Sequence, residues 1–488
     1  MVALGAINEW QPPHGPVTTW MVSPAAREAA RNARRNGLAA SFQRAQHLRA
    51  AYDGKAKGKQ LPRLMVVAWE IAGVCDIPAM TAAISAHVRR HDSYHDWFEF
   101  ENDVIVRRTI DNPEAIDFVP VKFGQMAAEQ IRKHALATTP ETLQWGGFTF
   151  GIVQHTGYFT FYASVDHLYI DGMSAGVIFF DIHLAYDALR RAPHQQPAPI
   201  PQIAQIASYR GYAARQHERV ASLTLSSPEI KDWIKFVRGT RGHWPRFPLP
   251  LGDTEAGTRG DFVTVELMDA TQTESFDTAC REAGARFSGG VLACAALAER
   301  DLTGTDTYYG FAPYDTRAPG TDTLTVGWFA SLVPVTVPIG SGSFPEVARA
   351  AQNSFDAAKH IAGVPFERVL QLTTPDQLGI ELRARSELMV SFLDLRKIPL
   401  AALFEETNFG TYGDSLSLGG INIWINRQAD KTTVTISFPD NPVARASVHR
   451  YIAALNGAFA RVVQHTVDWV NAVEDHANSG HGIPVIRL

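Results

Sequence analysis

Residues 164–172 read SVDHLYIDG, and the sequence on either side indicates how this stretch is placed. Two runs rich in aromatic and β-branched residues, 148–153 and 158–163, precede it. A Gly-containing turn separates the two runs, which predicts a β-hairpin. After the stretch, apolar residues recur at helical spacing, which predicts a helix. His167 and Asp171 are therefore expected on a loop between a strand and a helix, where a rigid scaffold can present them.

The pattern His167-x-x-x-Asp171-Gly172 places a residue type suited to proton transfer on this loop. An imidazole titrates near neutral pH, so its neutral form can take a proton as a general base. A histidine with an aspartate four residues later is also common on surface loops. The pattern is weak evidence by itself, and other motifs along the chain are needed to decide its meaning.

Further motifs along the chain occur in the order typical of one superfamily. They are LGAINEW at 4–10, SFQRAQHLR at 41–49, RRHDSYHDWF at 89–98, TYYGFAPYDTR at 307–317, VGWFASLVPV at 326–335 and NFGTYG at 408–413. With the His167 motif, they make the chain resemble CoA-dependent acyltransferases of the condensation-domain superfamily. Within it, the chain is most similar to the mycobacterial polyketide-associated (Pap) acyltransferases, which acylate trehalose-type glycolipids.

The resemblance implies an α/β fold with mixed sheets. Two chloramphenicol-acetyltransferase-like halves would form a V with a central tunnel. His167 would be the general base. Asp171 would hold the loop by pairing with an arginine, for which Arg317 is the candidate, and Gly172 would complete the motif.

Two positions depart from the family pattern. The superfamily often has a second histidine directly before the catalytic one, and this chain has Asp166 there. Asn408 replaces the aspartate of an Asp-Phe-Gly motif whose glycine is Gly410, and Thr411 replaces the tryptophan that follows. The first position is commonly structural, so the role of His167 is unaffected. The role of the loop with Asn408 and Gly410 stays open.

The expected reaction moves a long-chain fatty or polyketide-derived acyl group from a CoA or carrier-protein thioester. The acceptor is a hydroxyl of trehalose or a trehalose derivative, in cell-envelope glycolipid biosynthesis. The resemblance implies no metal or redox cofactor. A polyketide synthase is a candidate partner, and no nucleic acid is expected. The expected location is the cytoplasm, with at most peripheral contact at the inner face of the membrane.

A competing signature overlaps the first. Residues 172–176 read GMSAG, which matches the Gly-x-Ser-x-Gly elbow of serine esterases, with Ser174 as nucleophile. That elbow needs a strand from a parallel sheet, whereas the preceding strand belongs to a predicted hairpin. Ser174 is also well placed to cap the following helix. A peptide-forming condensation enzyme and a binding module without turnover are further alternatives.

The length of 488 residues suggests about two to four domains. Prolines cluster between residues 193 and 201, which predicts a linker. The domains are therefore an N-terminal half at 1–200, which carries the His167 motif, and a C-terminal half at 201–488. Alternating strands and helices in both are compatible with this layout. Residues 1–24 are predicted as an extended lead-in and 326–335 as a strand.

Charge and cysteine content exclude several classes of protein. A net charge of −5 gives no global basic field to attract nucleic acid. Three cysteines without a Cys-x-x-Cys pair argue against a disulfide framework and fit a reducing cytoplasm. The N-terminus lacks a signal-peptide pattern, and no apolar run approaches the ~20 residues that span a bilayer.

Two local patterns have both a functional and a structural interpretation. Residues 25–63 are basic and could contact CoA phosphates or an anionic membrane, although a solvated helix and loop is favoured. His91 and His95 could bind a metal. A structural role is favoured for them, because the sequence offers no third ligand nearby.

Overall fold

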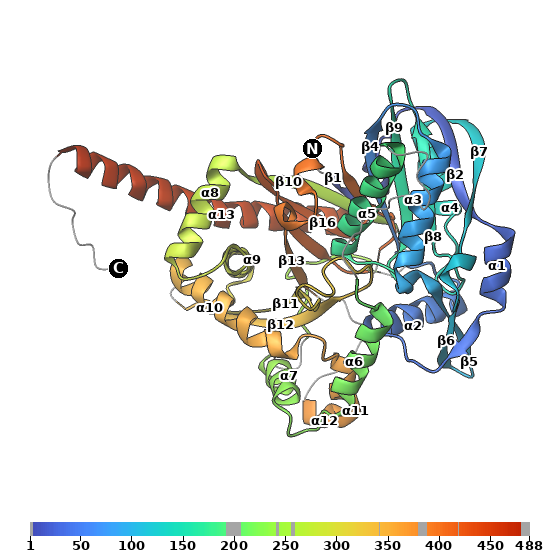
Figure 1. The fold of residues 1–488 in the computed structure, drawn as a ribbon. Helices are drawn as coiled ribbons and strands as arrows, with labels where there is room; N and C mark the ends of the chain where they lie inside the picture. The colour runs from blue at the N-terminus through green and yellow to red at the C-terminus, as the bar shows by residue number, and fades with distance from the viewer. Residues whose placement is uncertain are drawn as a thin grey trace.

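The computed structural model describes residues 3–191, 206–240, 244–254, 259–340, 342–378, 388–417 and 419–479. These residues form two lobes that lie side by side, each built on a mixed sheet with helices packed against it (Figure 1). The predicted α/β architecture with two halves is confirmed. The predicted linker at 193–201 lies outside the described residues, so a boundary near residue 200 stays a prediction.

The N-terminal lobe contains a seven-stranded sheet in the order β1-β14-β4-β9-β8-β2-β7. Its strands are β1 (Ala3–Ala6), β14 (Gly410–Gly413), β4 (Leu64–Ala72), β9 (Tyr158–Asp166), β8 (Phe148–Gln154), β2 (Gly15–Val22) and β7 (Phe118–Met126). Strands β8 and β9 pair antiparallel, which confirms the predicted hairpin. A smaller sheet lies beside it, with strands β3 (Arg34–Asn36), β6 (Val104–Thr109) and β5 (Asp96–Glu101).

Both faces of the large sheet are covered. Val67 and Trp69 of β4 lie in one core with helices α3 (Ile77–Arg90) and α5 (Gly172–Arg191). Val66 and Ala68 lie in a second core, with α4 (Ala128–Ala137), because successive strand residues point to opposite faces. Burial on both faces explains why β4 reads as a continuous apolar run. The remaining helices of this lobe are α1 (Pro24–Arg31) and α2 (Phe42–Ala56).

The C-terminal lobe contains a six-stranded sheet in the order β10-β16-β15-β13-β11-β12. Its strands are β10 (Gly260–Asp269), β16 (Lys431–Pro439), β15 (Asn422–Arg427), β13 (Met389–Asp394), β11 (Thr307–Asp315) and β12 (Ala330–Pro338). The helices that follow the linker are α6 (Tyr209–Ala221), α7 (Pro228–Gly239), α8 (Ala270–Glu282), α9 (Phe287–Thr303), α10 (Phe344–Ala357), α11 (Phe366–Leu372), α12 (Pro375–Leu378) and α13 (Pro442–Ser479). Short 3-10 segments lie at Ile7–Glu9, Asp92–His95, Pro113–Ala115, Ala358–Ile361, Leu395–Lys397 and Ala401–Leu403.

The two lobes share chain segments. Strand β14 comes from the C-terminal half of the sequence but pairs with β4 in the N-terminal sheet. Strand β1 pairs with β14, and its Leu4 carbonyl accepts hydrogen bonds from Thr264 and Thr435 of the C-terminal sheet, both at 3.2 Å. Strand β14 and the Leu4 carbonyl therefore join the two lobes.

Two predictions about local structure are wrong. Residues 1–24 are not only a lead-in, since β2 lies between β8 and β7 inside the large sheet. The strand predicted at 326–335 begins only at Ala330. Residues 326–329 form a loop instead, because residues of the N-terminal lobe, and not a neighbouring strand, accept hydrogen bonds from the N–H groups of Val326, Gly327 and Phe329.

Candidate active site

His167 follows the last residue of β9, and Asp171 precedes the first residue of α5, as predicted. The backbone N–H of His167 donates to the carbonyl of Arg63 at 2.7 Å, which ties the loop to the start of β4. The imidazole lies against the Trp328 ring, with 3.9 Å between ring centroids. Its Nδ1 is buried and makes no hydrogen bond to any described residue. Nε2 is therefore the ring nitrogen left to face a substrate.

The environment of His167 favours the neutral ring. Burial lowers its pKa below the usual 6.5, and the charge of His47 acts in the same direction. The backbone carbonyl of His167 itself and the carboxylates of Asp171 and Asp166 oppose this shift without reversing it. A histidine that stays neutral at neutral pH can accept a proton.

Asp171 is locked by Arg317, as the resemblance implies. The Arg317 guanidinium donates to both carboxylate oxygens, at 2.9 and 2.8 Å, and only 4% of each side chain is exposed. Burial opposes ionisation, but the charge and hydrogen bonds of Arg317 hold the pKa of Asp171 below its usual range. Asp171 also accepts from the backbone N–H groups of Ser174 and Phe329, each at 2.9 Å. Its oxygens are so fully engaged that it cannot serve as a second base.

The loop at 326–329 is held by the N-terminal lobe through three hydrogen bonds. Val326 N–H donates to His91 Nδ1 at 3.2 Å, Gly327 N–H to Ser174 Oγ at 3.1 Å, and Phe329 N–H to Asp171 Oδ2 at 2.9 Å. Trp328 lies between these anchors, and its carbonyl accepts from Tyr209 Oη at 2.7 Å. These hydrogen bonds on either side of Trp328 therefore fix its indole ring against His167.

Ser174 has a structural role that differs from the one predicted. Helix α5 begins at Gly172, so Asp171 is the capping residue and Ser174 lies inside the first turn. The fully buried Ser174 Oγ lies 2.9 Å from both Asp171 Oδ1 and the Gly327 carbonyl oxygen, and its single proton can be donated to either one. It also accepts from Arg317 at 3.0 Å. No imidazole lies among these partners, and the preceding strand belongs to an antiparallel hairpin, which argues against a nucleophile elbow.

Asp166, at the position of the family's additional histidine, lies in a second buried network. Arg63 donates to its Oδ2 at 3.1 Å, and Thr142 donates to the same oxygen at 2.7 Å. His47, from α2, places Nε2 2.9 Å from Oδ1. The pair brings a second histidine close to His167, with 6.5 Å between ring centroids.

Asn408 and Gly410 lie away from these networks. Asn408 adopts a left-handed backbone conformation, with φ of 49°, and its side chain donates to Glu70 at 3.1 Å. Gly410 begins β14, opposite Ala68 of β4. Within the described part of the chain, neither residue has a recorded contact with His167, and their contribution to the site stays a prediction.

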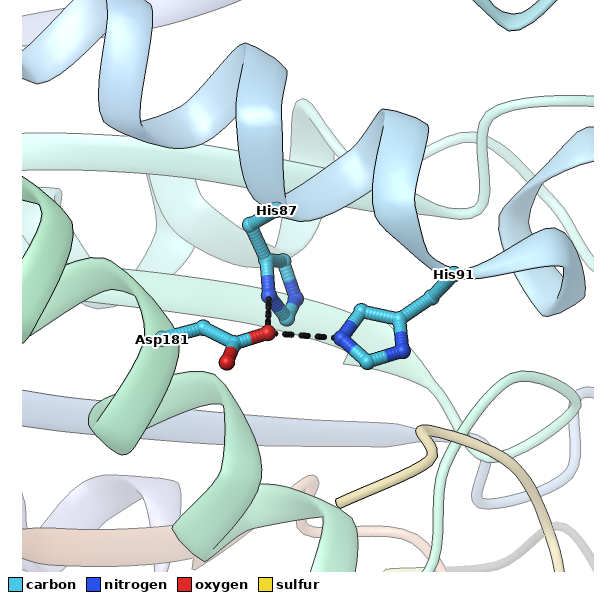
Figure 2. A group of neighbouring side chains, drawn as sticks. All are labelled: His87, His91 and Asp181. Atoms are coloured by element: carbon cyan, nitrogen blue, oxygen red, sulfur yellow. Dashed lines mark hydrogen bonds and ion pairs between the residues drawn. The ribbon is translucent and has the colours of Figure 1, made fainter. Parts of the chain in front are cut away.

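His91 forms a hydrogen bond with Asp181, a contact that the sequence did not suggest. Figure 2 shows His87 of α3 and His91, directly after it, pointing at Asp181 of α5. Asp181 Oδ2 lies 3.0 Å from His87 Nδ1 and 2.6 Å from His91 Nε2. His95, which the metal hypothesis paired with His91, instead contacts the Val88 carbonyl.

These three residues are close enough to raise the question of a metal ion. His91 Nδ1 accepts from the Val326 N–H, so Nε2 of the neutral ring must carry the proton, whereas a ligating nitrogen must lack it. His87 is likewise engaged on both nitrogens, with Tyr94 Oη 3.1 Å from Nε2. The cluster is thus a hydrogen-bond network that joins two helices through Asp181 Oδ2. A cavity of about 800 Å³ lies beside it, along α3 and α5, and His167 does not line it.

The basic stretch at 25–63 is largely paired. Its ion pairs include Arg31–Glu28, Arg34–Asp111, Arg35–Glu101, Arg49–Asp103, Lys55–Glu141 and Arg63–Asp166. Arg44 is fully buried and stacks on Tyr209. These contacts favour the structural interpretation of the stretch.

Comparison with known proteins agrees with this geometry. The Condensation domain family matches residues 60–381. Acyltransferase PapA3 of Mycobacterium tuberculosis is 43% identical over 470 residues, or 95% of this chain and 97% of that protein. Trehalose-2-sulfate acyltransferase PapA2 of the same organism is 43% identical over 469 residues, or 96% and 98% of the two chains. The chain belongs to the condensation-domain family.

Within this family, the chain is similar to acyltransferases in three dimensions as well. A solved structure of PapA2 acyl transferase has a TM-score of 0.89 and 42% identity, and the match covers 94% of this chain and 99% of that one. The chain is an acyltransferase of the condensation-domain family. In the described part of the chain, none of the helices has both the length and the apolar character needed to cross a membrane.

Sequence reasoning missed His47, Arg63 and Trp328 as parts of the site. The first two meet Asp166 over sequence separations of 119 and 103 residues, which no local pattern reveals. Trp328 belongs to the motif at 326–335. Because that motif was predicted to be a strand throughout, the loop that turns Trp328 towards His167 was not expected. Asp166 was the available signal, because a buried carboxylate beside a catalytic histidine requires a partner.

Proposed function

We propose that this acyltransferase moves a long-chain fatty or polyketide-derived acyl group from a thioester of CoA or a carrier protein to a hydroxyl of trehalose or a trehalose derivative. The observation that carries the proposed mechanism is His167, whose pKa is lowered by burial and whose ring lies against Trp328. The relatives support this acceptor, since PapA2 of Mycobacterium tuberculosis is named a trehalose-2-sulfate acyltransferase. The product would belong to cell-envelope glycolipid biosynthesis.

The proposed reaction begins when His167 takes the proton of the sugar hydroxyl. The sugar oxygen forms a bond to the thioester carbonyl carbon, and the carbonyl electron pair moves to oxygen. The tetrahedral intermediate then collapses with cleavage of the carbon–sulfur bond, and protonated His167 returns its proton to the thiolate. Asp171 and Arg317 hold the loop throughout, and no group on the protein is acylated.

Purified protein, a long-chain acyl-CoA and a panel of acceptors test this proposal. The panel contains trehalose, trehalose 2-sulfate, glucose, a long-chain diol and an aminoacyl carrier thioester, and mass spectrometry identifies the products. Acylated trehalose or trehalose sulfate is expected. His167→Ala should lower turnover by ~10²–10⁴, which is the usual contribution of a general base.

A matched control is His360→Gln, since His360 is a half-exposed histidine that also pairs with an aspartate, Asp232. It should leave turnover unchanged. Transfer to the diol alone would indicate a wax-ester-type enzyme, and amide formation on the carrier would indicate a peptide-forming one. Near-normal turnover by folded His167→Ala would remove His167 from the mechanism.

The partner and location remain part of the proposal. A polyketide synthase could supply a carrier-bound donor, and a peripheral contact at the cytoplasmic face of the membrane would bring the enzyme to a lipid product. Replacing acyl-CoA with the acylated carrier protein in the same assay tests the first idea. Sedimentation with anionic vesicles tests the second.

A further inference from the structure

His47 lies at the same place as His167 and Trp328, although it comes from a different element. Its ring is 5.6 Å from the Trp328 ring and 6.5 Å from the His167 ring, measured between centroids. The side chain is 13% exposed, whereas that of its partner Asp166 is completely buried. The Nε2 edge of the His47 ring therefore contacts Asp166, and the opposite edge of the ring can face the site.

Asp166 determines which nitrogen of His47 is held. Burial opposes ionisation of Asp166, but the hydrogen bond and charge of His47 and the nearby Arg63 bring its pKa below the usual value. An ionised carboxylate only accepts hydrogen bonds, so the proton between the two residues is on His47 Nε2. Arg63, Thr142 and the Leu168 N–H hold the carboxylate in place. The remaining nitrogen, Nδ1, is free to face the site.

The two histidines differ in what surrounds their rings. His47 Nε2 lies 2.9 Å from the completely buried carboxylate of Asp166, whereas burial lowers the pKa of His167. Neighbouring titratable groups with opposite protonation states commonly divide the work of catalysis. The His167 ring suits a base, and the donor role of His47 requires a proton on Nδ1 as well as on Nε2.

The reaction requires such a donor where negative charge develops on the thioester oxygen. Many backbone N–H groups around His167 already donate within the protein. They are the N–H groups of His167, Leu168, Tyr169, Val326, Gly327 and Phe329. These N–H groups are not available to a substrate, whereas the His47 side chain, held at Nε2 by Asp166, lies beside His167 and Trp328.

We propose that His47, positioned by Asp166, is a second catalytic residue that donates a hydrogen bond from Nδ1 to the thioester carbonyl oxygen. As the sugar oxygen bonds to the carbonyl carbon, the electron pair moves to this oxygen and the hydrogen bond strengthens. When the carbon–sulfur bond breaks, the electron pair returns to reform the carbonyl. The sugar proton travels through His167 to the thiolate, and His47 keeps its own proton throughout. The inference rests on the proposed role of His167.

Steady-state kinetics with long-chain acyl-CoA and the best acceptor test the role. His47→Leu removes the donor and should lower kcat by ~10²–10³, the usual effect of losing one oxyanion donor, with little change in KM. His47→Gln can still donate to Asp166, which protects the fold, and its kcat should fall between those of His47→Leu and wild type. His360→Gln is again the control, and thermal melting confirms that the variants are folded. Wild-type kcat in either folded His47 variant overturns the proposal.

A pair of CoA analogues separates oxyanion stabilisation from general damage to the site. A trifluoromethyl ketone analogue presents an oxygen that can become an oxyanion, whereas the S-alkyl thioether lacks that oxygen. His47→Gln should bind the ketone more than tenfold more weakly and the thioether as wild type does. Equal loss for both analogues would assign His47 a merely structural role.

Trp328→Phe removes the other side-chain N–H beside His167 and should leave the ketone preference intact. Loss of that preference in Trp328→Phe but not in His47→Gln would transfer the donor role to Trp328. The role of His47 and the proposed role of His167 can be disproved independently of each other. Inactive His167→Ala with fully active His47 variants overturns only the role of His47, whereas fully active His167→Ala overturns the proposed mechanism itself.

Discussion

Two buried aspartates flank His167, and they differ in what they hold. Asp171 contacts Arg317 and the N–H of Phe329, both from the C-terminal half of the sequence. Asp166 contacts His47, Arg63 and groups nearby, all from the N-terminal half. Both carboxylates have pKa values held below the usual range by partners that outweigh burial.

The difference lies in the partners. A guanidinium is always protonated and has no acceptor, so Arg317 can join the two halves but cannot exchange a proton. An imidazole has a second nitrogen that stays open when the first is held. The Asp171 pair therefore fixes the geometry of the site, whereas the Asp166 pair offers a group that can act on a substrate. Selective substitution should separate these two roles.

The largest effect on stability is expected at the pair between Asp171 and Arg317. Removing one partner leaves the other buried without compensation, so Asp171→Asn and Arg317→Ala should each cost about 3–5 kcal/mol in free energy of unfolding. Chemical denaturation measures this cost. The double variant should lose less than the sum, because the single losses share one interaction.

The exposed pair Arg31–Glu28 provides the control for this experiment. Arg31→Ala should cost less than ~1 kcal/mol, as is usual for surface ion pairs. If the losses at Asp171 and Arg317 are additive, the two residues do not stabilise each other, and the comparison between the two aspartates fails.

A smaller effect is expected for Ser174→Ala. The hydroxyl bridges Asp171 and Gly327, so its loss should cost about 1–3 kcal/mol by leaving buried polar groups without a partner. Turnover should fall far less than in His167→Ala, and a serine-directed fluorophosphonate should not label the protein. Stoichiometric labelling at Ser174 would instead support the esterase alternative.

The smallest effect concerns pH. The base works only when it is neutral, and burial lowers the pKa of His167 below 6.5. We therefore expect kcat/KM to keep its full value as the pH is lowered to 6.5, and to fall at a pH more acidic than 6.5. Trp328→Ala should admit water to the ring and move this fall to higher pH, whereas Trp328→Phe should move it less. A pH–rate profile for each variant provides the measurement. A fall in wild-type kcat/KM centred above pH 6.5 would contradict the environment described for His167.

Local sequence predicted the elements that local physics controls. The hairpin before His167 follows from β-branched and aromatic runs around a glycine turn. Local preference also accounts for the start of helix α3, where the Asp76 carboxylate accepts from the Ala79 N–H at 3.0 Å. The pairing of Asp171 with Arg317 came from family resemblance, because their separation of 146 residues has no local signature.

Predictions failed where distant partners control the backbone or the side chain. Residues 326–329 look like the start of a strand, but His91, Ser174 and Asp171 hold their N–H groups and keep them out of the sheet. Ser174 looks like a helix cap, but Asp171 takes that position and the serine turns to Gly327. In both cases tertiary hydrogen bonds override local preference.

The sequence by itself determined the alternation of strands and helices, the loop that carries His167, and the residue types able to move a proton. These depend on periodicity, turn residues and intrinsic pKa values, which are properties of short segments. Only the tertiary structure decided which nitrogen of His167 is open, that Trp328 lies against it, and that His47 is held beside it by Asp166. Protonation and reactivity depend on burial and on charges a few ångströms away, and folding brings those charges from remote parts of the chain.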